Sequence, residues 1–363
     1  MPEDPSQTIQ NILKYYDLGE LADYEKNERG YCNISFAIQT QKNRQRQWYF
    51  FRQYKSSICE DELRFEHSLI QHLVSIGQPP VARVHLTRHG TTFIRQPAEK
   101  DQCRYFAIFD YLPGEDRYTW INPHCSPTEL TNSAATLAAY HQAVWNFHPQ
   151  GKRQEPCIAP LLEKIGANLQ TCLSSPALSA FHPELSPHHN GIQLTLKKLS
   201  ERMANLEPQL FPRLVIHCDF HPGNLKFQGD QVVGLFDFDW SKLDYRLFDL
   251  ALALFYFCTE WEGERDGELR LEEAARFIQA YQNSLIPSSV PPLSTAECSL
   301  LPEFIEAANL YVLNWSIEDI LHKPVDEQEY CMYLRHGVRT WSWLNQNENK
   351  QRTLNALNIS STM

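Results

Sequence analysis

Several common signals are missing from this 363-residue sequence, and each absence removes a class of protein. The 10 cysteines form no C-x-x-C pair, so neither a zinc site nor the disulfide framework of a small secreted domain is predicted. No apolar run approaches the roughly 18 residues that a membrane-spanning helix needs. The acidic first residues, MPEDPSQTIQ, do not resemble a signal or transit peptide. We therefore expect a cytoplasmic protein with reduced thiols and no membrane partner.

An excess of positive charge is missing as well. The formal net charge is -11, and no basic run is longer than a few residues, so no nucleic-acid partner is predicted. Hydrophobic residues make up 42% of the chain and charged residues 21%, which is typical of a globular protein with one large domain or two ordinary ones. An acidic chain of this kind favours small cationic or zwitterionic partners. The oligomeric state is not predicted.

The first part of the chain predicts a small antiparallel sheet with one helix packed on it. Residues 28–54 alternate as strands on both sides of a polar turn. Residues 59–77 place apolar side chains at helical spacing and end at a glycine, which is a typical helix stop. Strand patterns return in three short segments, 81–87, 91–96 and 104–112.

Helices are predicted for most of the chain after the Pro-Gly turn at residues 113–116. A Ser-x-x-Glu capping box begins one helix at Ser126, and a second capping box begins another at Ser294. A further helix is expected at about residues 191–207.

A strand at residues 213–220 and a hairpin at 225–239 interrupt the helical pattern. The sequence therefore predicts an α+β fold in two parts. Residues 1–112 form a small antiparallel-sheet region with one helix, and residues 113–363 form a larger, mainly helical region.

The most informative stretch is HCDFHPGN, residues 217–224. On an extended strand alternate positions share one face, so His217, Asp219 and His221 are candidates for a three-ligand metal site. Alternatively, the histidines are ordinary residues whose rings hydrogen-bond to the backbone. The stretch alone does not choose between these interpretations, and the chain around it favours a third.

The third interpretation is a phosphoryl-transfer site. Asn224 follows Asp219 by five residues, which is the spacing of the kinase catalytic loop H-R-D-x-x-x-x-N. A polar turn and the apolar strand VVGLFDFD then bring Asp237 to the place where kinases carry a metal-binding Asp-Phe-Gly. Phosphoryl transfer to a hydroxyl needs a carboxylate that accepts the proton and oxygen ligands that hold magnesium on the phosphates. These three residues supply those groups.

The string HCDFHPGNLKF…VVGLFDFDWSKLDYRLFDLA resembles the aminoglycoside phosphotransferase and homoserine kinase family, which has a protein-kinase-like fold of two lobes. The resemblance implies ATP and Mg²⁺ as cofactors. It implies that Asp219 is the catalytic base and that Asn224 and Asp237 are magnesium ligands. It also implies that His217 braces the loop through hydrogen bonds and that Asp239 is a further acid next to the metal.

The resemblance also assigns nucleotide-binding residues to the N-terminal lobe, residues 1–112. Arg52 on a strand is expected to bind phosphate oxygens and to pair with Glu66 on the helix that follows. Gly30, with Asn33 downstream, is expected to lie in the loop over the phosphates. The segment FAIFDYLPGE resembles the hinge between the lobes, where backbone groups of the family bind adenine. The candidates there are the carbonyl of Asp110 and the amide of Leu112.

The sequence departs from the family pattern at two positions, Arg52 and Cys218. Arg52 stands where Lys is usual, although an Arg also carries the charge and can bind phosphate oxygens bidentately. The G-x-G-x-x-G of protein kinases is absent, but the single Gly30 with Asn33 downstream resembles the loop of this family. Cys218 stands where the family usually has Gly, at a position that carries no chemistry.

The acceptor is predicted to be a small molecule, because only FDWSKLDYRLF separates Asp237 from Asp249 and leaves no room for the substrate platform of a protein kinase. The C-terminal segments resemble the homoserine kinase branch most closely. Homoserine is therefore favoured, followed by another amino alcohol such as choline and then by an aminoglycoside. An atypical Ser/Thr protein kinase and a pseudokinase that binds nucleotide without turnover are the alternatives. Candidate contacts to an ammonium group, by charge and by cation–π contact, are Glu260, Glu262, Asn314, Trp315, Glu318 and Asp319.

Overall fold

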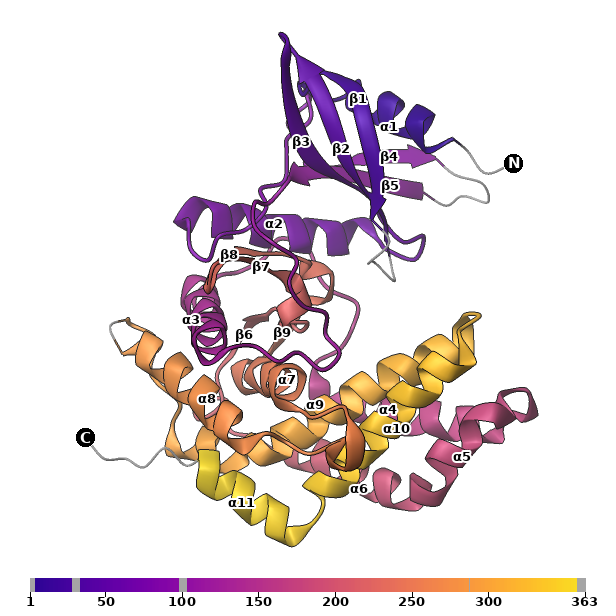
Figure 1. The fold of residues 1–363 in the computed structure, drawn as a ribbon, viewed down its shortest axis with the longest axis vertical. Coiled ribbons are helices and arrows are strands. Elements are labelled where there is room, and N and C mark those ends of the chain that lie inside the picture. The colour runs from indigo at the N-terminus through magenta and orange to yellow at the C-terminus, as the bar shows by residue number, and fades with distance from the viewer. Residues whose placement is uncertain (1–3, 28–32, 98–102, 287, 358–363) are drawn as a thin grey trace. The chain divides into compact units, whose positions relative to one another are not determined.

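The computed structural model describes residues 4–27, 33–97, 103–286 and 288–357, and it divides into two compact units (Figure 1). The first unit is Met1–Gly114 together with two short returning segments, His148–Arg153 and Val233–Phe236. The second unit is Glu115–Phe147, Gln154–Val232 and Asp237–Met363.

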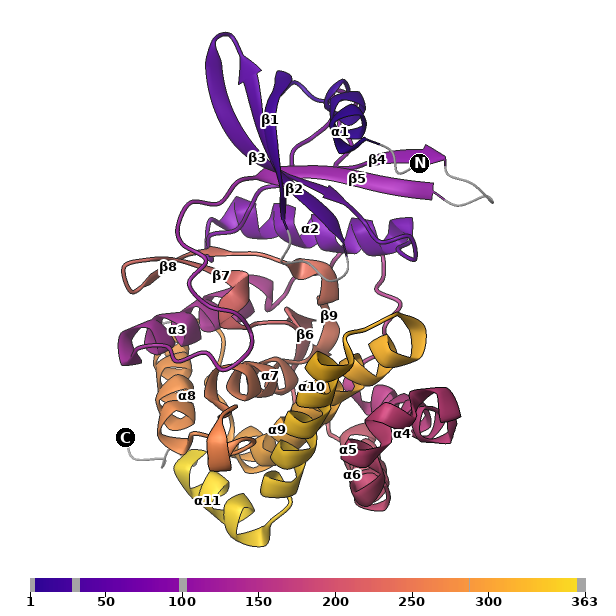
Figure 2. The same ribbon diagram turned by 45° about the vertical axis from the view of Figure 1, so that its right-hand side comes forward.

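The first unit contains a five-stranded antiparallel sheet in the order β1-β2-β3-β5-β4 (Figure 2). Its strands are β1 (Glu20–Asn27), β2 (Ile34–Lys42), β3 (Gln45–Gln53), β4 (Ile94–Pro97) and β5 (Cys103–Asp110). The β2–β3 hairpin turns through Asn43 and Arg44, which both have positive φ, as a two-residue turn between twisted strands requires. The central strand β3 carries Arg52, whose partners in the ladder are Ser35 on β2 and Ala107 on β5.

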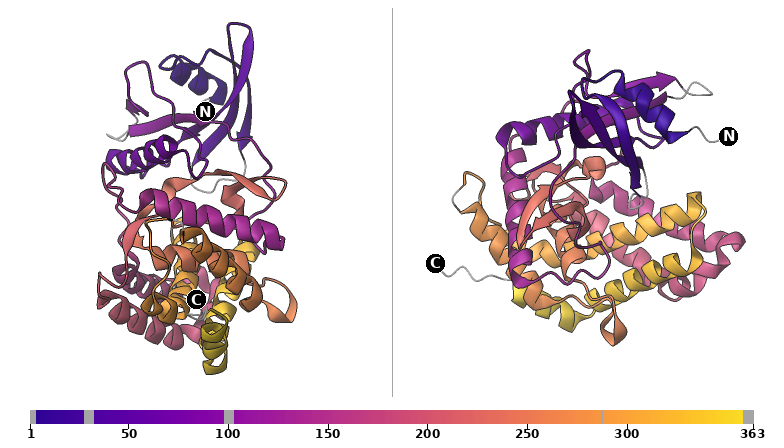
Figure 3. Two further views of the ribbon diagram at one scale, coloured as in Figure 1. Left: turned by 90° about the vertical axis from the view of Figure 1, so that its left-hand side faces the viewer. Right: turned by 45° about the horizontal axis from the view of Figure 1, so that its top comes forward.

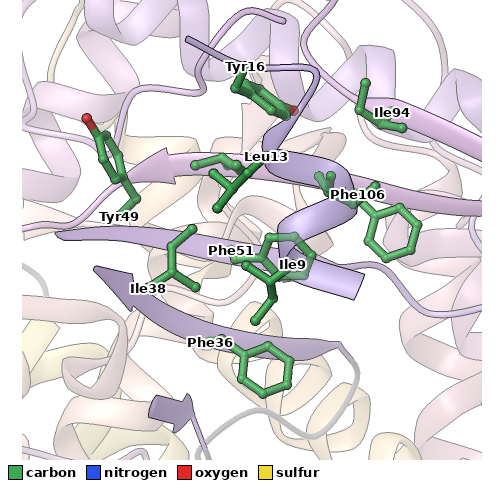
Figure 4. Close-up of a cluster of buried hydrophobic side chains, with 11 residues drawn as sticks. Ile9, Leu13, Tyr16, Phe36, Ile38, Tyr49, Phe51, Ile94 and Phe106 are labelled. Carbon is green, nitrogen blue, oxygen red and sulfur yellow. The ribbon is translucent and has the colours of Figure 1, made fainter. Parts of the chain in front are cut away.

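A short helix, α1 (Pro5–Leu13), covers part of this sheet and supplies much of its hydrophobic core. Asp4 caps the helix by accepting a hydrogen bond from the Ser6 amide, and Pro5 occupies the first helical position. Figure 4 shows the α1 side chains pointing toward those of the strands. The cluster comprises Ile9, Ile12, Leu13, Tyr16, Phe36, Ile38, Tyr49, Phe51, Ile94, Phe106 and Ile108.

The longer helix of the first unit, α2 (Glu60–Ile76), lies within the predicted range 59–77. Its first turn carries Glu60, Asp61 and Glu62, which interact favourably with the positive end of the helix dipole. Gly77 ends the helix in the left-handed conformation with φ 78°, where a side chain would be strained. The buried face of α2 includes Glu66 as well as apolar residues, so a carboxylate is placed inside the unit.

Some strand predictions for this unit were wrong. Residues 81–87 form only isolated bridges, Val81 with Leu235 and Val84 with Phe109, because this segment lies beside other chain segments without joining a ladder. The first strand β1 and the helix α1 were not predicted. β1 has no buried residue, so its sequence shows no hydrophobic alternation, and α1 is shorter than the windows in which helical periodicity is clear.

The second unit is mainly helical, as predicted, and its core is formed around α7 (Arg246–Cys258), in which every residue is buried. The helices α9 (Thr295–His322) and α10 (Glu327–Leu344) lie side by side, and both are drawn toward the yellow end of the colour scale in Figure 3. The other helices are α3 (Pro127–Val144), α4 (Ile158–Ser174), α5 (His182–Leu185), α6 (His189–Ala204), α8 (Leu271–Leu285) and α11 (Asn347–Leu357).

Two small antiparallel ribbons come between α6 and α7 in chain order. Strand β6 (Arg213–Ile216) pairs with β9 (Lys242–Tyr245), and β7 (Leu225–Gln228) pairs with β8 (Gln231–Leu235). The strand predicted at 213–220 therefore ends at Ile216, and the chain continues as a loop. No helix in the described part of the chain is both long and apolar enough to cross a membrane. The small antiparallel sheet followed by a larger helical region confirms the predicted fold class.

Candidate active site

The loop after β6 is held in place by a buried carboxylate from α7. Asp249 Oδ2 accepts a hydrogen bond from the His217 amide at 2.8 Å, and its Oδ1 accepts one from the Cys218 amide at 2.8 Å. Nε2 of His141 on α3 lies 3.1 Å from the same carboxylate, and the His141 Nδ1 lies 2.7 Å from the hydroxyl of Tyr281 on α8. Three helices therefore fix the backbone of this loop.

The backbone turns sharply at Cys218, which has φ 65° and is almost fully buried. Its Sγ lies 3.6 Å from the Tyr311 hydroxyl, so the side chain is packed against α9. A positive φ is unfavourable for any residue other than glycine, and such strain is found most often at functional sites. The turn directs the next residue, Asp219, away from the course of β6.

Asp219 and Asn224 are joined directly. The Asn224 Nδ2 donates to the Asp219 Oδ2 at 2.9 Å and to the Asp219 main-chain oxygen at 2.9 Å. His221 Nε2 lies 3.6 Å from the same carboxylate oxygen. The His221 Nδ1 accepts a hydrogen bond from the Gly223 amide, so the proton of the neutral ring is on Nε2, toward Asp219. The carboxylate is thus surrounded by polar hydrogens.

These neighbours determine the ionisation of Asp219. Burial is the largest influence on the pKa of this carboxyl and raises it. The combined effects of His221, His217 and the Asn224 hydrogen bond act in the opposite direction and outweigh burial, so the pKa of Asp219 is lowered from its ordinary value. Asp219 is therefore ionised at neutral pH and can accept a proton.

His217 faces the interior of the second unit. Its side chain is fully buried, its Nδ1 accepts a hydrogen bond from the Asp219 amide at 3.3 Å, and its ring centroid lies 4.9 Å from that of Phe238. This is the position expected of a residue that braces the loop. The three-ligand alternative fails because the left-handed turn at Cys218 removes the shared face of an extended strand. Among the described residues, no group of three His, Cys, Asp or Glu side chains is arranged to hold a metal ion.

Asp237 follows the last strand of the β7–β8 ribbon. It has φ 66° and ψ 66°, a left-handed conformation at the start of the short 3-10 turn Phe238–Trp240. Asp239 lies inside that turn and is buried. Asp237, which was predicted to be functional, is thus a second residue with a strained backbone conformation.

The donor set in the second unit suits a magnesium ion. The Asn224 amide directs its nitrogen to Asp219, so its carbonyl oxygen is the atom that remains for a cation. Asp237 and Asp239 add carboxylates, and Mg²⁺ is bound by oxygen ligands of this kind.

In the first unit the structure brings Arg52 and Glu66 together. The Arg52 Nη1 lies 3.5 Å from the Glu66 Oε1, and both side chains are at least nine-tenths buried. The guanidinium carbon also lies 5.6 Å from the ring centroid of Phe109 and 5.8 Å from that of Tyr54. The pair that was predicted from a strand and a following helix is thus formed by β3 and α2.

The other nucleotide-binding candidates of the first unit lie in separate places. Gly30 falls outside the residues that the structure describes. Asn33 Oδ1 accepts a hydrogen bond from the Lys55 amide at 2.9 Å and so ties the start of β2 to the end of β3. Asp110 ends β5 and Leu112 follows it, both partly buried.

The Asp110 side chain is engaged within its own unit. His85 Nε2 lies 2.7 Å from its Oδ1, and Arg83 Nε lies 3.2 Å from its Oδ2. Burial raises the pKa of the Asp110 carboxyl, but His85 and Arg83 outweigh burial and lower it. These contacts fix the side chain and leave the predicted adenine contact to the main chain.

An aromatic cluster that the sequence analysis missed begins beside Asp219. The ring of Tyr256 on α7 lies 5.2 Å from that of His221, and Asp219 contributes to the raised pKa of Tyr256, after burial. Trp120 lies 6.3 Å from Tyr256, and it also contacts Trp261 at 5.3 Å, Trp315 at 5.9 Å and Tyr333 at 4.9 Å between ring centroids. Of the residues predicted to meet an ammonium group, Trp315 belongs to this aromatic cluster.

The predicted acids have partners of their own. Glu318 is bound by Lys164 at 2.7 Å, and Asp319 accepts a hydrogen bond from the Tyr330 hydroxyl at 2.7 Å. Asn314 accepts one from Asn168 at 2.9 Å. Glu260 lies next to Trp261 and 4.0 Å from His124, whereas Glu262 is exposed. No sequence signal pointed to Trp120 or Tyr256, since isolated aromatics are most often core residues.

The chain is similar to known proteins along most of its length. Residues 23–287 match the phosphotransferase enzyme family. A homoserine kinase of Parvibaculum lavamentivorans is 28% identical over 340 residues, which cover 92% of this chain and 94% of that protein. A solved complex of an amicoumacin kinase with AMP-PNP, Ca²⁺ and Ami has a TM-score of 0.70 at 15% identity and covers 97% of this chain and 98% of its own. The structure of a microcompartment-associated aminopropanol kinase has a TM-score of 0.63 at 14% identity. The similarity covers 98% of this chain and 99% of that kinase. The protein-kinase-like fold is confirmed.

Proposed function

Because this chain belongs to the phosphotransferase enzyme family and is a kinase that phosphorylates a hydroxyl group, we propose that its acceptor is homoserine or a related amino alcohol. The phosphoryl donor is ATP and the metal is Mg²⁺. The observation that carries the proposal is the polar enclosure of Asp219 by Asn224 and His221, which keeps a largely buried carboxylate ionised. The extensive similarity to homoserine kinases supports the choice of acceptor.

In the proposed reaction, the acceptor hydroxyl oxygen attacks the γ-phosphorus and the bond to the β-phosphate oxygen breaks. Asp219 orients the hydroxyl and takes its proton. Groups that act as general bases contribute about 10²- to 10⁴-fold to rate. His217 and Asp249 hold the loop backbone, so the carboxylate is already positioned before the acceptor binds.

Arg52 binds phosphate oxygens and Glu66 holds the guanidinium in position, whereas Asp110 and Leu112 bind adenine through their main-chain groups. Asn224 and Asp237 would hold Mg²⁺, and Asp239 would be a further acid at that site. The ion would supply positive charge that neutralises the phosphate oxygens during transfer.

The aromatic cluster beside Tyr256 supports an acceptor with an ammonium group. The faces of tryptophan and tyrosine rings attract cations, by about 0.5–2 kcal/mol depending on exposure. Trp120, Trp261 and Trp315 are each partly exposed. The same observation favours a second candidate, a choline-type amino alcohol, whose larger cation offers more contact with aromatic faces.

The test measures ADP release with Mg²⁺ and ATP across homoserine, choline, ethanolamine, 1-amino-2-propanol, an aminoglycoside and a dephosphorylated protein. We expect the highest kcat/KM with homoserine, and the product identified as the phosphate ester by ³¹P NMR. A higher kcat/KM for choline would select the second candidate. Turnover of the protein substrate alone would support an atypical protein kinase, and nucleotide binding without turnover of any acceptor would support a pseudokinase.

A further inference from the structure

Beside the Arg52–Glu66 pair lies a buried hydrogen-bonded chain that no step above uses. Tyr54 follows the end of β3, and its hydroxyl lies 3.3 Å from the Glu66 Oε1 and 2.8 Å from the His67 Nε2. The His67 Nδ1 lies 2.8 Å from the hydroxyl of Thr92, in the loop before β4. Side chains from three segments of the first unit, the end of β3, α2 and the loop before β4, thus form one chain that ends at the Glu66 carboxylate.

We propose that Thr92, His67 and Tyr54 form a hydrogen-bond relay that fixes Glu66 and, through it, Arg52, so that Tyr54 and His67 are positioning residues for ATP binding. The proposal rests on the proposed phosphate-binding role of Arg52. The critical contact is at Glu66 Oε1, because the Tyr54 hydroxyl and the Arg52 Nη1 both approach this one oxygen.

The directions of the hydrogen bonds determine how the relay works. The Tyr54 hydroxyl has one proton, which can point to Glu66 or to His67. If His67 carries its proton on Nε2, the ring donates to the Tyr54 oxygen and Tyr54 donates to Glu66. The Thr92 hydroxyl then donates to the His67 Nδ1, and every group in the chain has a partner. In the other tautomer Tyr54 must donate to His67, and Glu66 loses that hydrogen bond.

The burial of the relay makes Glu66 more dependent on the hydrogen bond from Tyr54. Tyr54 is 3% exposed, Glu66 1% and His67 1%, so water does not replace a missing donor. The His67 ring lies 5.9 Å from the ring of Phe93 and 5.8 Å from that of Phe109. In such apolar surroundings a hydrogen bond to a carboxylate is stronger than in water.

The first test compares ATP and acceptor binding. In Tyr54→Phe, we expect the dissociation constant for AMP-PNP, measured by calorimetry with Mg²⁺, to rise about three- to tenfold. The acceptor KM should not change. Tyr16→Phe is the matched control, because Tyr16 is a buried tyrosine of the same unit whose hydroxyl makes no hydrogen bond within the described residues. An unchanged AMP-PNP affinity in Tyr54→Phe, or an equal loss in Tyr16→Phe, would overturn the relay.

His67 provides a conservative pair of variants. A glutamine amide nitrogen can take the place of Nε2 and keep the donor toward Tyr54, whereas an asparagine is too short to do so. We expect His67→Gln to retain AMP-PNP affinity within about twofold and His67→Asn to lose about as much as Tyr54→Phe. Equal losses in the two variants would contradict the relay. ¹⁵N NMR of the wild-type ring should show the proton on Nε2, and a proton on Nδ1 would also refute it.

Arg52→Ala separates this inference from the proposal on which it rests. If Arg52→Ala weakens AMP-PNP binding and Tyr54→Phe causes no further loss in that background, the relay acts through Arg52 as proposed. If Arg52→Ala weakens binding but Tyr54→Phe alone has no effect, the phosphate role stands and the relay is wrong. Normal binding by Arg52→Ala overturns both.

Discussion

Cys218 allows the strain in the catalytic loop to be measured. At φ 65° a residue with a Cβ costs about 1–2 kcal/mol relative to glycine. Replacing Cys218 with Gly releases that strain but removes a side chain that is 1% exposed, which costs about 1–2 kcal/mol of burial. The added freedom of glycine in the unfolded chain costs a further ~0.4–1 kcal/mol. We therefore expect the stability of Cys218→Gly to lie between about 0.6 kcal/mol above and about 2 kcal/mol below that of the wild type.

Two other substitutions complete the series. Cys218→Ala keeps the Cβ and loses only the sulfur, so it should be destabilised by about 1 kcal/mol. Cys218→Val adds a β-branched side chain at positive φ in a packed site, and overpacking alone costs about 1–3 kcal/mol. Urea unfolding measured for all four proteins gives the ranking, with Val clearly the least stable.

Measurement of kcat distinguishes an effect of the Cys218 substitutions on the geometry of the loop from an effect on stability. Asp249 binds the amides of residues 217 and 218, not their side chains, so Cys218→Gly should keep kcat within a few-fold of the wild type. The reasoning about strain would be refuted if Cys218→Val were as stable as Cys218→Ala, or if the glycine variant were the least stable of the series.

Three further outcomes are expected. Asp219→Asn should lower kcat about 10²- to 10⁴-fold while AMP-PNP affinity, measured by calorimetry, is retained; activity within a few-fold of wild type would remove Asp219 as the base. Arg52→Ala should weaken ATP binding about ten- to a hundredfold and Arg52→Lys less, because lysine keeps the charge but loses the bidentate geometry; equal losses would argue against a bidentate contact. His221→Ala removes a group that lowers the pKa of Asp219 and leaves burial, which raises it, so the pKa should rise. Since activity needs the ionised carboxylate, the acidic limb of the kcat/KM profile should move to higher pH, and an unmoved limb would show that His221 does not set this pKa.

The local parts of the site could be predicted because their spacing is set by short-range geometry. Asn224 lies only five residues after Asp219 and donates a hydrogen bond to its carboxylate. The sequence pattern is therefore enough to find both residues. Arg52 and Glu66 are separated by one strand end and the first turns of a helix, so strand alternation and helical spacing bring them together.

The parts that could not be predicted depend on contacts between distant segments. The motif around Asp249 was recognised, but its hydrogen bonds to residues 217 and 218 and its contact with His141 follow only from the packing of α3 against α7. The departure from glycine at Cys218 was interpreted as one at a position that carries no chemistry. The positive φ gives the physical reason why glycine is usual there, and a sequence does not display backbone torsion angles.

The contacts of Asp249 also bear on the order in which the chain becomes active during synthesis. The loop at residues 217–218 needs Asp249, and that carboxylate needs His141, whose ring is in turn bound by Tyr281 on α8. The His141–Tyr281 contact spans 140 residues of sequence, and contacts of such separation form late because a long loop must close first. The His141–Tyr281 contact, which holds the histidine beside Asp249, therefore cannot form until α8 has left the ribosome, after Asp219 has already been exposed.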